Sequence, residues 1–93
     1  MKRSDSYNSV WDALSDNAEQ AANLKARSEL MIQIGLIVQG NEWTQTEAAK
    51  QCGISQPRMN DLLRGKLALF SLDALVNIAA KLGKQVHLVL EAA

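Results

Sequence analysis

The sequence is poor in cysteine and in long apolar runs, and these shortages exclude several classes of protein. A single cysteine, Cys52, excludes an intramolecular disulfide and fits a reducing compartment. No run of about 18 apolar residues is present, so we expect no membrane span. The first residues lack the apolar core of a signal peptide, and we therefore expect a cytoplasmic protein.

The chain also lacks net charge, because its ten basic residues balance its ten acidic ones. Nucleic-acid-binding domains are usually basic, so bulk charge does not favour that function. The distribution is more informative. Residues 43–66 contain four basic side chains, Lys50, Arg58, Arg64 and Lys66, against two acidic ones. The sequence thus predicts a local positive segment.

Catalytic and metal-binding motifs are missing from the sequence. There is no glycine-rich phosphate loop, no nucleophile–base constellation and no metal-ligand spacing. We therefore predict a protein that is not an enzyme and needs no cofactor or metal. Cys52 precedes a turn glycine, which favours a buried small residue over a redox switch. His87 has no second histidine or cysteine nearby, which favours a surface strand residue over a metal ligand.

Apolar periodicity predicts a single, mainly α-helical domain of 93 residues. Tyr7, Val10, Trp11 and Leu14 predict a short amphipathic helix. A longer helix follows at about 17–39, in which Gly35 marks a close helix crossing. Further helices are expected at 44–53, 55–64 and 71–82. Alternating Val86, Leu88 and Leu90 predict a C-terminal β-strand. We accordingly divide the chain into residues 1–16, 17–83 and 84–93.

The stretch CGISQPRMNDLLRGK begins with a glycine and carries a proline in what reads as a helix. Gly53 suits a tight turn that needs a positive φ. Ala49 and Met59 lie four residues before it and six after it, a spacing that predicts a helix-turn-helix over 44–64. With Ser55 as N-cap, Pro57 falls in the first helical turn, where its missing amide hydrogen costs little.

The second helix of this pair exposes a polar side suited to the major groove of DNA. Its N-terminal residues are placed to reach base edges, with Gln56 suited to adenine and Arg58 to guanine or a phosphate. The other polar residues are placed to hold the backbone. The predicted DNA-binding set is Thr44, Gln45, Ser55, Gln56, Pro57, Arg58, Asn60, Asp61, Arg64 and Lys66.

The segment WTQTEAAKQCGISQPRMNDLLRGK resembles the helix-turn-helix of the lambda-repressor-like Xre family. The resemblance extends over about residues 7–91 and is to a subgroup with many antitoxins encoded beside RelE-like toxins. It implies a five-helix lambda-repressor-like domain with a short C-terminal β-strand. Two residues depart from the pattern. Asp61 stands where a neutral or basic residue is common, and Trp43 replaces a leucine.

The resemblance implies a homodimeric repressor that binds double-stranded operator DNA and neutralises a RelE-like toxin. We assign toxin contact to Tyr7, Val10, Trp11 and Leu14, which lie outside the minimal DNA-binding core. The alternative is that Trp11 packs on the long helix. Val86, Leu88 and Leu90 are assigned to dimerisation through an exposed strand edge. The alternative function is a protein-binding adaptor, or a stand-alone phage-type regulator without a toxin.

Overall fold

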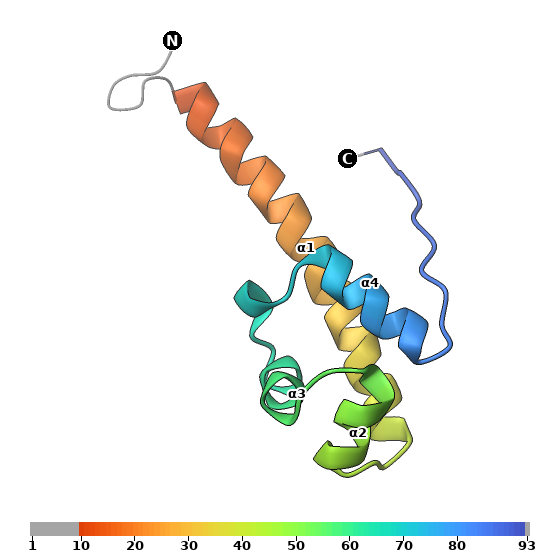
Figure 1. Cartoon of the computed structure of the whole chain (residues 1–93). Coiled ribbons are helices and arrows are strands. Elements are labelled where there is room, and N and C mark those ends of the chain that lie inside the picture. Colours follow the sequence, from red (N-terminus) through yellow and green to blue (C-terminus); the bar gives the residue numbers. More distant parts are fainter. Residues whose placement is uncertain (1–9, 93) are drawn as a thin grey trace.

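The computed structural model describes the backbone of residues 10–92 and the side chains of residues 17–92 (Figure 1). Four α-helices follow one another: α1 (Val10–Gly40), α2 (Gln45–Cys52), α3 (Gln56–Leu63) and α4 (Leu72–Lys81). A single 3-10 turn, η1 (Leu67–Leu69), connects α3 to α4. Beyond α4 the chain runs without regular structure to residue 92. The prediction of a mainly α-helical domain is confirmed.

The first helix corrects the prediction of two separate N-terminal helices. α1 is one continuous helix of 31 residues, so the described domain has four α-helices and not five. The run Ser15–Asn17, whose composition is typical of a helix cap, does not interrupt it. These residues cost a helix at most about 0.7 kcal/mol each, and neither glycine nor proline occurs between residues 10 and 34 to break it.

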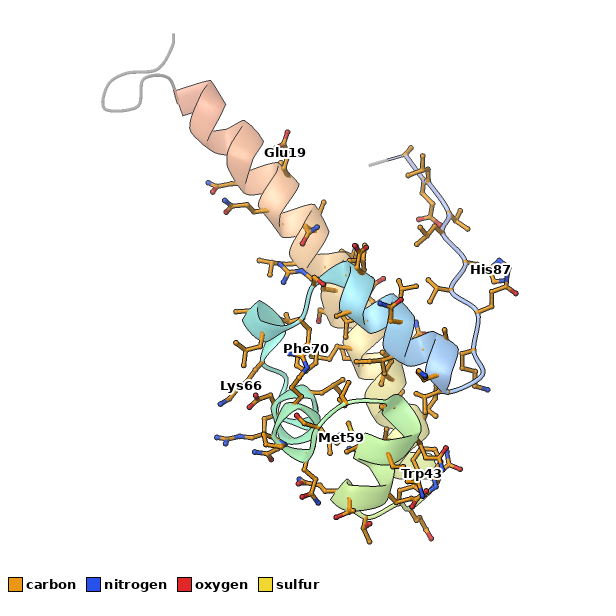
Figure 2. The ribbon with its side chains drawn as sticks, viewed as in Figure 1. Glu19, Trp43, Met59, Lys66, Phe70 and His87 are labelled. Atoms are coloured by element: carbon orange, nitrogen blue, oxygen red, sulfur yellow. The ribbon has the colours of Figure 1, made fainter. Side chains whose placement is uncertain are left out.

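The core lies where the inner half of α1 meets the three shorter helices. Met31, Ile34 and Val38 line the buried side of α1 and are at most 5% exposed. They pack in one cluster with residues from α2, α3 and α4, and the fully buried Phe70 closes the end beside η1. Met59 and Phe70 point into this cluster in Figure 2. This core holds α2 and α3 in a fixed relation.

The outer half of α1 projects from the core (Figure 1). Every residue from 17 to 26 is exposed, including Leu24 at 43%. This half of α1 is named the outer arm and comprises residues 10–26. Across residues 10–92, neither this helix nor any other is both long and apolar enough to cross a membrane.

The end of α1 shows how the chain turns toward α2. Asn41 donates from Nδ2 to the carbonyl oxygen of Ile37 at 2.8 Å and so caps the helix. Glu42 takes a left-handed conformation with φ of 57°. Gly35, expected at a helix crossing, would meet no atom within 4 Å if it carried a Cβ. Among residues 10–92 no helix crosses closely there, and that prediction is wrong.

The C-terminal β-strand is also corrected. Among residues 10–92 no segment is a strand, and residues 84–92 carry no regular structure. A strand needs a hydrogen-bonded neighbour, and four helices supply none. Leu88, Val89 and Leu90 are 82%, 77% and 101% exposed. The leucines of the alternating pattern are therefore not buried by any other described part of the chain.

Candidate nucleic-acid interface

α2 and α3 form a bent pair joined at Gly53. This glycine has a φ of 72°, and the amide of Ile54 donates to the carbonyl oxygen of Ala49 at 3.0 Å to close the turn. Ala49 is 4% exposed and Met59 is fully buried at the angle between the two helices. The predicted glycine-hinged helix pair is confirmed in the structure.

Both helices begin with side-chain caps, of which the one at Ser55 was predicted. Thr44 accepts from the amide of Glu47 at 3.1 Å, and Ser55 accepts from the amide of Arg58 at 3.3 Å. Pro57 lies in the first turn of α3, as predicted. The caps aim the N-terminal ends of α2 and α3 outward. Helix N-termini carry partial positive charge and free amides, which suit phosphate groups.

The C-terminal end of α3 is fixed by a left-handed Gly65 with φ of 75°. The amide of Lys66 donates to the carbonyl oxygen of Asp61 at 3.1 Å, and that of Gly65 donates to Leu62 at 3.0 Å. These two bonds make a Schellman motif. The motif turns the chain back at the end of α3, and Nζ of Lys66 lies 3.6 Å from Oδ1 of Asp61.

The exposed surface of the pair carries polar side chains from both helices. Gln45, the first residue of α2, donates from Nε2 to Oδ1 of Asn60 at 3.4 Å. Gln56 donates from Nε2 to Oγ1 of Thr46. Thr46, which is absent from the predicted set, belongs to this surface through its bond with Gln56. We name this surface the reading face; its members are Gln45, Thr46, Gln56, Pro57, Asn60, Asp61, Arg64 and Lys66.

Arg58 has a different environment from the other predicted residues. Its guanidinium carbon lies 4.4 Å from the centre of the Phe70 ring, a cation–π arrangement. Its Nη1 donates to the carbonyl oxygen of Leu69 at 3.5 Å. The side chain is half-buried against the η1 segment, whereas Gln56 and Pro57, the first two residues of α3, are exposed.

A second arginine, which the sequence did not single out, holds the same segment from the other side. Arg27 of α1 donates from Nη1 to the carbonyl oxygens of Leu67 at 3.1 Å and Phe70 at 3.3 Å. The segment after α3 is therefore clamped between α1 and α3. The contact joins residues about forty positions apart in the sequence, so no local sequence pattern indicated it.

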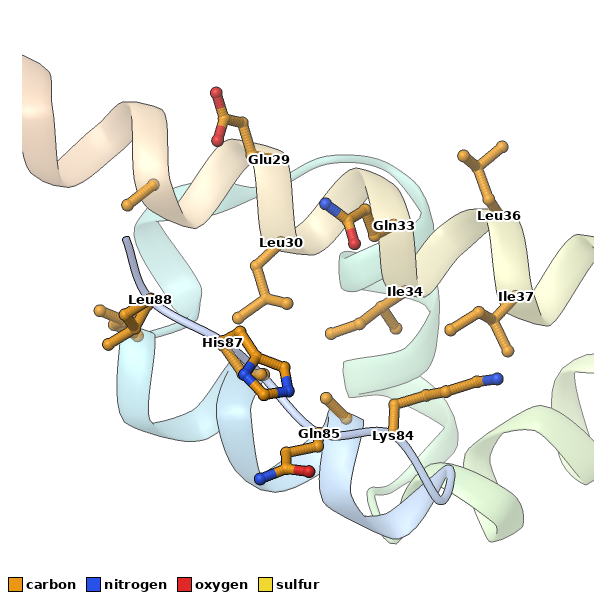
Figure 3. Close-up of a pocket in the computed structure, with 14 residues that line it drawn as sticks. Glu29, Leu30, Gln33, Ile34, Leu36, Ile37, Lys84, Gln85, His87 and Leu88 are labelled. Carbon is orange, nitrogen blue, oxygen red and sulfur yellow. The ribbon is translucent and has the colours of Figure 1, made fainter. Parts of the chain in front are cut away.

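The residues predicted for dimerisation lie away from the reading face. Tyr7 and the side chains of Val10, Trp11 and Leu14 lie outside the described part of the protein. Val86 is half-buried and, with Leu88, lines a groove of about 570 Å³. Leu30, Ile34 and Ile37 of α1 form the opposite wall of this groove (Figure 3).

Cys52 has the buried structural position that its place before the turn glycine predicted. Cys52 is 1% exposed and packs in the core, and burial raises the pKa of its thiol. Trp43 is partly buried and packs against the same core. Within the described residues, no three His, Cys, Asp or Glu side chains gather as metal ligands would.

These helices and their turn define a helix-turn-helix domain, and comparison with known proteins agrees. A family model described as "Helix-turn-helix domain" matches residues 13–91. The chain belongs to this family, which is a non-enzymatic class of DNA-binding domain. The prediction that it is not an enzyme is confirmed by that membership.

One solved structure with the same fold is named "Putative XRE Family Transcriptional Regulator". The two chains share 24% identity with a TM-score of 0.73, over 80% of this chain and 83% of the other. At that identity the likeness shows the fold alone. No curated protein sequence matched the chain.

Proposed function

We propose that the protein is a sequence-specific transcriptional repressor of the Xre type that binds operator DNA through α3. One observation carries this proposal: α3 buries Met59 and Leu62 completely or nearly so, while Gln56 and Pro57 at its N-terminal end are exposed. An α-helix presented in this way fits the major groove, with its first residues toward the base edges.

In the proposed complex, the predicted residues divide into two roles. Ser55, Gln56, Pro57 and Asp61 face the bases. Thr44, Gln45, Asn60, Arg64 and Lys66 hold the backbone, the last two by charge. Arg58 completes the proposed set by its place in the first turn of α3. Its contact with DNA requires the guanidinium to leave the Phe70 ring.

Binding to duplex DNA from upstream of the protein's own gene tests this function. Fluorescence anisotropy across a salt series should give a log–log slope of about −5 to −7, for about six to eight phosphate contacts per dimer. Arg64→Ala or Lys66→Ala should each reduce the slope by about 2, because a dimer loses two contacts. Lys25→Ala on the outer arm is the charge-matched control. Absence of binding at low salt would overturn the proposal.

We propose further that the repressor is a homodimer paired through its C-terminal segment. Leu88 and Leu90 are 82% and 101% exposed, and backbone groups there have no strand partner among the described residues. Burying four such leucines in a two-fold dimer contributes about 6–12 kcal/mol, of the same order as the roughly 4–15 kcal/mol that association costs. The half-buried Val86 extends the same apolar row.

Sedimentation equilibrium measures this association directly. Leu88→Asp and Leu90→Asp should shift the protein to the monomer, because each places a charge at the interface. Leu24→Asp on the outer arm changes an exposed leucine of the same size and should leave the dimer intact. A wild-type monomer, or a dimer insensitive to both C-terminal changes, would contradict this assignment.

A second proposed function is antitoxin activity toward a RelE-like toxin, supported by the outer arm, which projects from the core and is exposed over residues 17–26. Residues 10–24 contain the acidic Asp12, Asp16 and Glu19 and no basic residue, which suits a basic partner. Tyr7, Val10, Trp11 and Leu14 provide the proposed apolar contact. Co-purification with the product of the neighbouring gene tests it, with Trp11→Glu expected to abolish capture and leave DNA binding unchanged. Failure of wild-type capture would favour a stand-alone regulator.

A further inference from the structure

The reading face contains an unusual group for a surface that approaches DNA, the carboxylate of Asp61. Its side chain is 27% exposed, and it shares α3 with Gln56 and Pro57. Pro57 lies four residues before it, so the two side chains follow one stripe of the helix. A lone carboxylate on this stripe would be repelled by phosphates, and its presence therefore calls for a specific partner.

Lys66 offsets that repulsion within the protein. The Schellman motif at the end of α3 brings its Nζ to 3.6 Å from Oδ1 of Asp61, and 46% of the lysine side chain stays exposed. Lys66 points away from the body of the domain in Figure 2. The pair thus carries no net charge, and the lysine remains available to a phosphate while the carboxylate lies nearer the helix axis.

Arg58, the charged donor within α3, is by contrast directed toward the segment that follows this helix. The Arg58 guanidinium is stacked on Phe70 and bonded to the Leu69 carbonyl. A guanidinium pairs with guanine O6 and N7. While Arg58 keeps this position, the amide of Gln56 and the carboxylate of Asp61 are the polar groups on the base-reading part of the face.

An ionised carboxylate only accepts hydrogen bonds. In the major groove guanine offers acceptors at N7 and O6, and thymine offers an acceptor and a methyl group, so both are poor partners. Adenine offers a donor beside an acceptor, which an amide matches and a carboxylate does not. Cytosine offers a single N4 amino donor, and acidic side chains pair with it.

From this arrangement we propose that Asp61 is a specificity-determining residue that accepts a hydrogen bond from the N4 amino group of a cytosine in each half-site. The proposal rests on the DNA-binding function proposed above. Lys66 acts as a positioning residue for the carboxylate and contacts the adjacent phosphate. The helix-turn-helix therefore requires a C·G pair at one position of its operator half-site.

Selection of bound duplexes from a random-sequence pool tests the proposal. The wild-type protein should enrich cytosine at one position of each half-site. Asp61→Asn, which exchanges an acceptor for an amide, should enrich adenine at that position. Its affinity should fall about 5- to 150-fold for each wild-type half-site, the equivalent of about 1–3 kcal/mol for one base contact. Glu29→Gln removes the same charge from an exposed position of α1 and should leave both the sequence and the affinity unchanged.

Two results would overturn the inference without touching the proposed function. One is that Asp61→Asn and wild type recover the same base at every position. The other is that Asp61→Ala tightens binding to all duplexes equally, as a purely repulsive carboxylate would. If instead the wild-type protein enriches no sequence and binds no duplex, the repressor function itself fails, and that outcome appears in the wild type and not in the variant.

Discussion

Arg27 of α1 donates a hydrogen bond from Nη1 to the carbonyl oxygen of Leu67 at 3.1 Å, and the contact links residues forty positions apart. A second bond from the same nitrogen reaches Phe70. Hydrogen bonds to charged groups contribute about 1.5–3 kcal/mol each, and these two satisfy part-buried carbonyls of the segment that leads away from α3.

Arg27→Met should lower the free energy of unfolding by about 1–3 kcal/mol, because the Phe70 carbonyl oxygen loses its donor while the Leu67 carbonyl oxygen keeps only the amide of Phe70. Urea unfolding followed by circular dichroism measures the change. Lys25→Met, two residues earlier on the exposed surface of the same helix, is the control and should change stability by less than about 0.5 kcal/mol. Equal losses for the two variants would contradict the proposed clamp.

Two glycines should respond in opposite directions to alanine. Gly53→Ala should destabilise by about 1–2 kcal/mol, because φ is 72° and the new Cβ would lie 3.3 Å from Cε of Lys81. Gly35→Ala should stabilise by about 1 kcal/mol, because the site is helical and a Cβ meets no atom within 4 Å. Thermal unfolding of both variants checks this, and a shift of the same sign in both would be inconsistent with the structure.

Cys52 should make stability fall at high pH. Burial raises the pKa of its thiol above the ordinary value of 9.0. Above about pH 9 the unfolded chain therefore releases this proton while the folded chain retains it, and the free energy of unfolding decreases as pH rises. Urea unfolding between pH 8 and 10 should show a steeper decline in wild type than in Cys52→Ala. Parallel pH profiles would argue against the buried thiol.

Glu42 offers a route to higher stability. Its φ of 57° is costly for a glutamate and readily adopted by asparagine or glycine. Glu42→Asn should raise the free energy of unfolding by about 0.5–1 kcal/mol, and the midpoint of thermal unfolding should rise with it. Glu19→Asn, on the exposed outer arm, is the matched control and should be neutral or slightly destabilising. A loss of stability in Glu42→Asn would contradict the strain.

The parts of the fold that local chemistry controls were predictable from the sequence. Thr44, Ser55 and Ser71 cap α2, α3 and α4 as their sequence patterns indicate, with Ser71 accepting from the amide of Ala74 at 3.1 Å. Gly53 adopts the positive φ that its turn requires. Caps and turns depend on neighbours only a few residues away, so one sequence contains the necessary information.

The errors and omissions involve contacts that local pattern does not encode. Ser15–Asn17 has a capping composition, but a cap acts only where the preceding chain leaves the helix, and nothing forces α1 to end there. Alternation in residues 86–90 predicts a strand only if a neighbour exists. Arg58 on Phe70 and Arg27 on Leu67 are tertiary contacts. The placement of the reading face was predictable, whereas the internal role of these arginines was not.

The continuity of α1 has a mechanical consequence. α1 is a single helix that includes the outer arm and also supplies Met31, Ile34 and Val38 to the core. No glycine or proline between residues 10 and 34 provides a hinge. A partner that binds the N-terminal end of α1 and tilts it would therefore move the whole helix as a rigid body. That movement would reach the core, where α1 packs against α3 and α4.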